Sequence, residues 1–196
     1  TYGANEVGPV ASQCIRREGF HIAADSLILE VIRDGKSVGP GETGEIVVTE
    51  LLNYAMPMIR YRVGDIGILS DQGCSCGRIF PLLKSVEGRL IDCFTLPDGR
   101  IVTPKSIQSV IQATPGVSRY QAVQHDGRRM TIELMRKESD PEVAVRELVE
   151  RCHSLLGDGI EIDVLIGDRK NLKAKFRPVI SKLTVSGEPR WTKPRR

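Results

Sequence analysis

The chain has 196 residues, of which 40% are hydrophobic and 27% charged, so it can bury a core and is not disordered as a whole. Its formal net charge is +3, and residues 186–196, which we expect to form a basic flexible tail, carry +3 by themselves. The rest of the chain is therefore neutral, which excludes a nucleic-acid-binding surface over the whole body. No apolar run approaches the ~18 residues that a membrane-spanning helix needs, and the odd count of five cysteines fits a reducing compartment such as the cytoplasm.

Residues 1–88 have the composition of turn-rich β structure. Strand patterns occur at residues 26–33, 44–51 and 65–70, where apolar β-formers are bounded by glycine and other turn residues. We therefore expect this half of the chain to be built from strands and loops.

Residues 93–185 have a different pattern, with two helix signals among strands. The expected elements are a strand at 100–103, a helix at 105–114, strands at 118–125 and 129–137, a helix capped by Asp140 with Pro141 at its first position and ended by Gly157, and a strand at 160–166. This β-α-β-β-α-β order predicts a small ferredoxin-like domain, and the whole chain is then an α+β protein.

Two short segments of the first half carry side chains suited to a nucleotide. Tyr2-Gly3-Ala4-Asn5-Glu6 places an aromatic ring and a carboxylate in one loop, where they could hold a base and a magnesium ion. Gly64 is followed by Asp65, whose carboxylate could accept two hydrogen bonds from a ribose diol. A plain loop and a turn-capping aspartate are the alternative interpretations.

Gly88-Arg89-Leu90-Ile91-Asp92 falls where the two halves meet. A glycine and an aspartate around two apolar residues suit a hinge at residues 89–92, because terminal loop residues can absorb backbone rotation. An ordinary interdomain linker fits the same residues.

Four further residues have the donor types of a zinc site. Cys14 and His21 lie near the N-terminus, and Cys74 and Cys76 lie far downstream with their side chains on one face of an extended segment. Three sulfurs and one imidazole complete a tetrahedral zinc site that leaves no open position, so such a site is structural. Buried thiols beside a surface histidine remain the alternative, and neither Cys93 nor Cys152 is expected to take part.

Taken in order, YGANE, PMIRYRVGD, CSCGR and GRLID resemble the adenylate-forming acyl-CoA synthetase superfamily, most closely the phenylacetate–coenzyme A ligase family with its CapK-like relatives. The resemblance runs from Tyr2 to about Lys182 and matches only the C-terminal half of such an enzyme. It implies that residues 1–88 are the β-rich end of the large AMP-binding domain. Residues 93–185 are then the small mobile lid domain.

The resemblance also implies roles for residues of the first half. Tyr2, Gly3 and Glu6 correspond to the motif that contacts adenine and magnesium, with Asn5 where the family has threonine. Asp65 corresponds to the acid that binds the ribose hydroxyls.

In the second half, the resemblance places Arg89 near the nucleotide and makes Asp92 the hinge acid. Lys175 stands where the family has a catalytic lysine that contacts the reacting carboxylate and the α-phosphate, and Lys173 is a competing assignment. Relatives with a similar cysteine and histidine pattern favour zinc as the ligand of the four-residue set.

The implied function is that of an ATP-dependent carboxylate–CoA ligase, which forms an acyl-adenylate and then an acyl-CoA thioester from a small, aryl-acetate-like acid. ATP, magnesium and coenzyme A are the implied cofactors, and the upstream N-terminal domain is the implied partner. The phosphate-binding loop is expected upstream, so this chain alone is expected to be inactive. A CapK-like adenylyltransferase that does not use CoA and a non-catalytic binding module held together by zinc are the alternatives.

Overall fold

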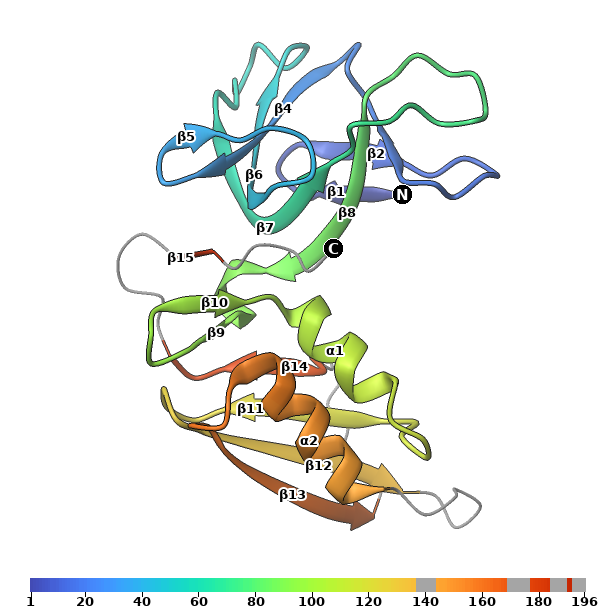
Figure 1. Cartoon of the computed structure of the whole chain (residues 1–196). Coiled ribbons are helices and arrows are strands. Elements are labelled where there is room, and N and C mark those ends of the chain that lie inside the picture. The colour runs from blue at the N-terminus through green and yellow to red at the C-terminus, as the bar shows by residue number, and fades with distance from the viewer. Residues whose placement is uncertain (137–143, 169–176, 184–189, 192–196) are drawn as a thin grey trace. The chain divides into compact units, whose positions relative to one another are not determined.

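The computed structural model describes residues 1–136, 144–168, 177–183 and 190–191 (Figure 1). The chain divides into two compact units, one over Thr1–Leu90 and the other over Ile91–Arg190. Among the described residues, no helix is long and apolar enough to cross a membrane.

The first unit is an eight-stranded antiparallel sheet in the order β1-β2-β3-β8-β7-β6-β4-β5. Its strands are β1 (Tyr2–Ala4), β2 (Gly8–Ser12), β3 (Phe20–Ile22), β4 (Leu27–Arg33), β5 (Lys36–Ser37), β6 (Thr43–Glu50), β7 (Tyr61–Leu69) and β8 (Leu82–Arg89). The strands expected at 26–33 and 44–51 are confirmed as β4 and β6. The one expected at 65–70 is the second part of a longer strand, β7, because Gly64 interrupts the strand pattern inside it.

This sheet curls strongly. Three strands, β2, β3 and β8, lie between β1 and β7 in the sheet order. In a flat sheet, β1 and β7 would therefore be about 19 Å apart. The Tyr2 hydroxyl nevertheless lies 3.0 Å from the Asp65 carboxylate on β7. The curl surrounds an apolar cluster that includes Val10, Ile46 and Leu83, each fully buried.

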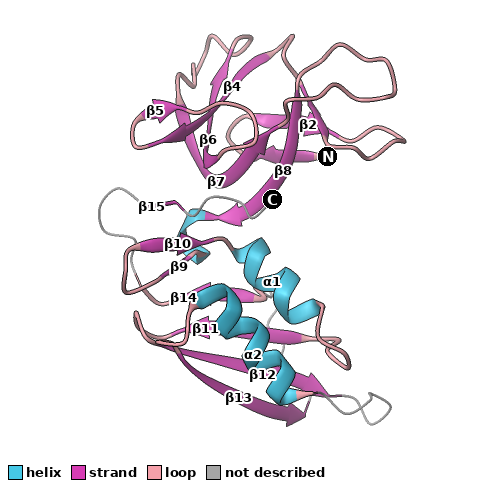
Figure 2. Ribbon diagram, in the orientation of Figure 1, coloured by secondary structure: helices cyan, strands magenta, loops and turns pink. Residues whose placement is uncertain are grey.

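The second unit contains two helices and two small sheets (Figure 2). Its elements are the 3₁₀ turn η1 (Leu90–Asp92), which begins one residue before the unit boundary, β9 (Phe94–Thr95), β10 (Arg100–Val102), α1 (Pro104–Gln112), β11 (Tyr120–Gln124), β12 (Arg129–Arg136), α2 (Val145–Leu156), β13 (Glu161–Asp168), β14 (Val179–Ser181) and β15 (Arg190–Trp191). Both helices cover the same face of the β11–β13 sheet. The predicted α+β class is confirmed.

The helices form for local reasons that the sequence carries. Thr103 caps α1 by accepting a hydrogen bond from the Ser106 amide at 3.3 Å, and Pro104 occupies the first turn. In α2 the buried residues Leu148, Cys152 and Leu156 recur at helical spacing and face the core of the unit. The expected cap at Asp140 and Pro141 lies outside the described residues.

The predicted order of elements is present, but the ferredoxin-like arrangement is not confirmed. The main sheet has the order β13-β12-β11-β14, and β10 belongs to a separate sheet, β15-β10-β9. The reason is local: the turn around Asp98–Gly99 folds β10 back onto β9, with the Gly99 amide donating to the Leu96 carbonyl at 2.9 Å. The sheet edge beside β11 is then taken by β14, in parallel register from Ala122↔Val179 onward.

Candidate functional site

The Gly64–Asp65 segment is a bulge in β7. Arg62 pairs with Val47 and Ile66 pairs with Glu45, so residues 63–65 stand opposite the single residue Ile46. Gly64 has a φ of +81°, a conformation that glycine adopts without strain. The bulge changes the direction in which the next side chain, Asp65, leaves the strand.

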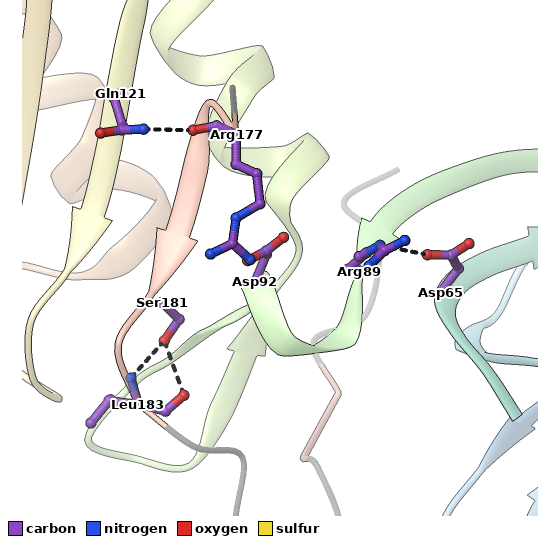
Figure 3. Close-up of polar contacts among 7 residues, drawn as sticks. All are labelled: Asp65, Arg89, Asp92, Gln121, Arg177, Ser181 and Leu183. Atoms are coloured by element: carbon purple, nitrogen blue, oxygen red, sulfur yellow. Dashed lines mark hydrogen bonds and ion pairs between the residues drawn. The ribbon is translucent and has the colours of Figure 1, made fainter. Parts of the chain in front are cut away.

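Asp65 is paired on two sides by residues that the sequence singled out. The Tyr2 hydroxyl donates to its Oδ2 at 3.0 Å, and the Arg89 guanidinium lies 3.9 Å from its Oδ1 (Figure 3). Arg89 stands directly opposite Asp65 in the β7–β8 register. The side chain of Asp65 is 18% exposed, so its carboxylate still reaches solvent.

Tyr2 and Tyr61, which lie against Asp65 and Glu6 respectively, keep their protons. Burial, together with the negative charge of Asp65, raises the pKa of Tyr2, so its hydroxyl acts as a donor. Desolvation raises the pKa of Tyr61, and a hydrogen bond with Glu6 adds to the shift. Glu6 therefore lies beside Tyr61 at the start of β7, and the structure brings the two N-terminal motif residues close to the same strand.

Close packing between two strands explains why residue 3 is a glycine. A Cβ atom at this position would lie 2.5 Å from the Gly8 carbonyl oxygen on the neighbouring strand. The tight β1–β2 hairpin therefore requires glycine at this position. Tyr2 lies on the first strand of this hairpin, and Glu6 lies in its turn.

Cys14, His21, Cys74 and Cys76 come together in the first unit, with all four donor atoms within 4.8 Å of one another. The sulfurs of Cys14 and Cys74 are 3.5 Å apart, and the Cys76 sulfur is 3.4 Å from His21 Nε2. Donors of a tetrahedral zinc site with bonds of ~2.0–2.3 Å are separated by about 3.5–3.8 Å. The four side chains therefore fit a zinc ion.

Two similar turns present these cysteines. The Arg17 amide donates to the Cys14 carbonyl at 3.1 Å, and the Gly77 amide donates to the Cys74 carbonyl at 3.3 Å. Arg17 and Gly77 both have positive φ, +55° and +81°. Sequence reasoning identified the ligands but not this matched pair of turns, for which Gly77 was the only local signal.

The polarity of the cluster also suits a metal. His21 is buried, and its Nε2 faces the sulfurs. Hydrogen bonding with His21 lowers the pKa of Cys14 to about 6, so this thiol is already close to the thiolate form that zinc binds. The pKa of Cys74 is raised to about 12, so its proton would leave only when a metal binds. Cys93 and Cys152 are buried in the second unit, outside this cluster.

Asp92 and Arg177 form an ion pair within the second unit. The Arg177 Nη1 atom lies 2.7 Å from Asp92 Oδ1, and Asp92 is almost completely buried at the end of η1 (Figure 3). The Arg177 carbonyl also accepts a hydrogen bond from Gln121 Nε2 at 2.9 Å. Sequence reasoning missed Arg177, and the candidate residues Lys173 and Lys175 lie outside the described residues.

Comparison with solved structures identifies the fold. A 2-hydroxyisobutyryl-CoA ligase in the postadenylation state superposes with a TM-score of 0.67 at 23% identity, over 85% of this chain and 38% of that one. An o-succinylbenzoate CoA synthetase from Bacillus subtilis in complex with its acyl-adenylate gives 0.53 at 22% identity, over 74% and 31%. The fold is that of the adenylate-forming CoA ligases.

Sequence comparison is more specific, although no protein-family profile matches the chain. A phenylacetate-coenzyme A ligase of Thermus thermophilus is 34% identical over 168 residues, which are 79% of this chain and 38% of that protein. The Escherichia coli phenylacetate-coenzyme A ligase is 28% identical over 84% of this chain and 40% of its own length. The chain is a homologue of the phenylacetate–coenzyme A ligases, as its motifs predicted, and spans about two fifths of their length.

Proposed function

We propose that the protein carrying this chain is an ATP-dependent, AMP-forming carboxylate–coenzyme A ligase. The homology to phenylacetate–coenzyme A ligases supports this activity. The single observation that carries the proposal is the hydrogen bond between Tyr2 and Asp65, because it joins two nucleotide-binding motifs that are 63 residues apart.

In this proposal, residues 1–88 are the β-rich end of the large AMP-binding domain. Residues 89–92 are the hinge, with Asp92 as its acid, and residues 93–185 are the small mobile domain. The upstream part of the large domain supplies the phosphate-binding loop and most of the acid-binding pocket.

The reaction has two steps. The carboxylate oxygen of a small, aryl-acetate-like acid attacks the α-phosphate of ATP, and pyrophosphate leaves. The thiol of coenzyme A then attacks the acyl carbonyl carbon, loses its proton, and AMP leaves with the electron pair of the acyl–oxygen bond.

Asp65 is the proposed ribose ligand. A carboxylate has about four lone-pair sites, so it can accept from the Tyr2 hydroxyl and from a ribose diol together. Arg89 partly compensates its charge from the opposite strand. Arg89, whose side chain is 63% exposed, is the proposed further contact to the nucleotide.

Further contacts are proposed for the remaining motif residues. Tyr2 and Gly3 line the adenine side, and Glu6 supplies a carboxylate oxygen for magnesium, which prefers oxygen ligands. Lys175, with Lys173 as the competing residue, neutralises charge on the carboxylate and the α-phosphate during adenylation.

We also propose a structural zinc ion on Cys14, His21, Cys74 and Cys76. The support is the mutual 4.8 Å limit on their donor atoms and the placement of His21 Nε2 at 3.4 Å from the Cys76 sulfur. Four protein donors fill the tetrahedral shell, so the metal would hold two loops together without taking part in the chemistry.

The decisive experiment measures nucleotide use by the complete protein with Asp65→Asn. Losing a charge-assisted partner costs about 1.5–3 kcal/mol, so ATP-dependent adenylation should fall roughly ten- to a hundredfold. Asp71→Asn, an exposed aspartate in the loop before β8, is the matched control and should leave the rate unchanged. Equal activity of Asp65→Asn and the wild type would refute the assignment.

Product analysis with phenylacetate, ATP and coenzyme A then tests the acceptor. Formation of AMP together with an acyl-CoA thioester supports a ligase. Transfer of the adenylyl group without use of coenzyme A would favour a CapK-like adenylyltransferase instead.

A further inference from the structure

Glu18 binds the residue that separates two of the candidate zinc ligands. Its Oε2 accepts a hydrogen bond from the Ser75 amide at 2.8 Å, and its Oε1 accepts one from the Ser75 hydroxyl at 2.7 Å. Both carboxylate oxygens therefore bind Ser75, which is 57 positions away in sequence.

The contact between Glu18 and Ser75 lies at the candidate zinc site. Glu18 lies between Cys14 and His21, and Ser75 lies between Cys74 and Cys76. One carboxylate thus connects the loop that carries two of the ligands to the loop that carries the other two. Holding both the main chain and the side chain of Ser75 restricts the directions in which the flanking sulfurs can point.

The neighbouring backbone brings Glu18 within reach. Strands β3 and β8 pair through Phe20↔Leu83 and His21↔Leu82, directly after the two loops. At Gly19 the chain runs so close to β8 that an added Cβ would lie 3.0 Å from the Leu83 carbonyl oxygen. Strand pairing fixes one end of each loop, and the contact between Glu18 and Ser75 fixes a point beyond it.

We propose that Glu18 is a positioning residue that prepares the cysteine and histidine cluster for its metal. This inference rests on the proposed zinc site. A metal that binds two unconnected loops must order both, whereas loops already joined by Glu18 lose less conformational freedom on binding.

Substitution of an outer partner of a metal site typically weakens metal affinity about 10- to 100-fold. Glu18 and Ser75 are both exposed, so water competes with their contact and we expect a value near tenfold for Glu18→Gln. Glutamine keeps one carbonyl oxygen for the Ser75 amide, but its contacts are neutral and therefore weaker than the charge-assisted hydrogen bonds of Glu18.

The test is a zinc titration of the full chain in competition with a chromophoric chelator. Glu18→Gln should raise the zinc Kd about tenfold. The visible spectrum of the cobalt-substituted protein should keep its thiolate-to-metal bands, because all four ligands remain. Glu42→Gln is the matched control, since the Glu42 carboxylate accepts instead from the Gly39 amide and from Arg33, and its zinc Kd should stay unchanged.

Ser75→Ala tests whether the hydrogen bond to Ser75, and not only the charge of Glu18, affects zinc binding. It keeps the carboxylate and removes only the contact at 2.7 Å, so zinc Kd should rise about threefold. The double variant should be less impaired than the product of the two single effects, because both remove the same link.

An unchanged zinc Kd in Glu18→Gln would overturn the positioning role while leaving the zinc site intact. A double variant impaired by the full product of the two single effects would also overturn it, since the two residues would then act independently. A wild-type chain that binds no zinc would instead refute the proposed zinc site.

Discussion

The two units of this chain are stabilised in different ways. In the described residues of the second unit, the main core cluster contains fifteen buried residues, against eight in the first unit. The first unit also has sulfur contacts between distant segments, such as Cys14 with Cys74, and the second has a distant contact of its own in the ion pair of Asp92 with Arg177. The difference lies in the depth of burial, because ten partly buried hydrophobic residues pack against the cluster of the first unit and five against that of the second. Contacts among sulfur donors that can share a metal therefore gain weight in the first unit.

Zinc removal should have the largest effect, and only on the first unit. A ligand present at a thousand times its Kd stabilises the folded state by about 4 kcal/mol, so chelation should remove about that much. Hydrogen exchange should speed up in β3 and β8 and stay the same in β11 and β12. Cys76→Ser should abolish zinc binding, whereas Cys152→Ala, in the other core, should retain it.

If exchange in both units sped up equally, the two units would not be independently stabilised. Zinc would then stabilise the chain as a whole rather than its first unit.

Leu148→Ala should destabilise the second unit by about 3 kcal/mol. Leu148 is fully buried on α2, and truncation there removes apolar contacts and leaves a cavity. Chemical denaturation should show the loss, and zinc content should remain as in the wild type. Leu165→Ala, at an exposed leucine of β13, is the control and should change stability by less than about 0.5 kcal/mol.

Arg177→Met should destabilise the second unit by about 2 kcal/mol, because it leaves the buried Asp92 carboxylate without its guanidinium partner at 2.7 Å. Met keeps the aliphatic stem, and the hydrogen bond from Gln121 to the main chain of residue 177 is preserved. Arg146→Met is the control, since its ion pair with Glu150 is exposed on α2.

The same variant bears on the proposed hinge. In the complete protein, the rates of adenylation and of thioester formation should change by different factors if Asp92 is the hinge acid. Equal factors would favour a purely structural role for the pair.

Tyr2→Phe should have the smallest effect, a loss of about fivefold in nucleotide affinity. It removes one hydrogen bond to Asp65, about 1 kcal/mol, and leaves the ribose-binding carboxylate in place. Isothermal titration of the complete protein with AMP measures it. An effect as large as that of Asp65→Asn would mean that Tyr2, and not Asp65, is the main contact.

Local sequence patterns predicted the elements whose formation depends on near neighbours. The helix after Thr103 has its cap and its proline in adjacent positions, and the strands around Asp126–Gly127 have the residues of a tight turn. The ligand set of Cys14, His21, Cys74 and Cys76 was also predicted, because cysteine and histidine are identifiable as donors wherever they occur.

Other features depend on partners that no local pattern identifies. The bulge at Gly64 is visible only in the register of β7 against β6, and the edge position of β14 beside β11 replaces the arrangement expected from element order. The sequence by itself therefore determined the helices, the α+β class and the candidate ligands, since these follow from residue types and short spacings, and its motifs carried the resemblance to the ligase family. Only the tertiary structure decided that Tyr2 meets Asp65, that Glu18 holds Ser75 and that Arg177 pairs with Asp92, because each contact depends on strand pairing and curl over more than 50 residues.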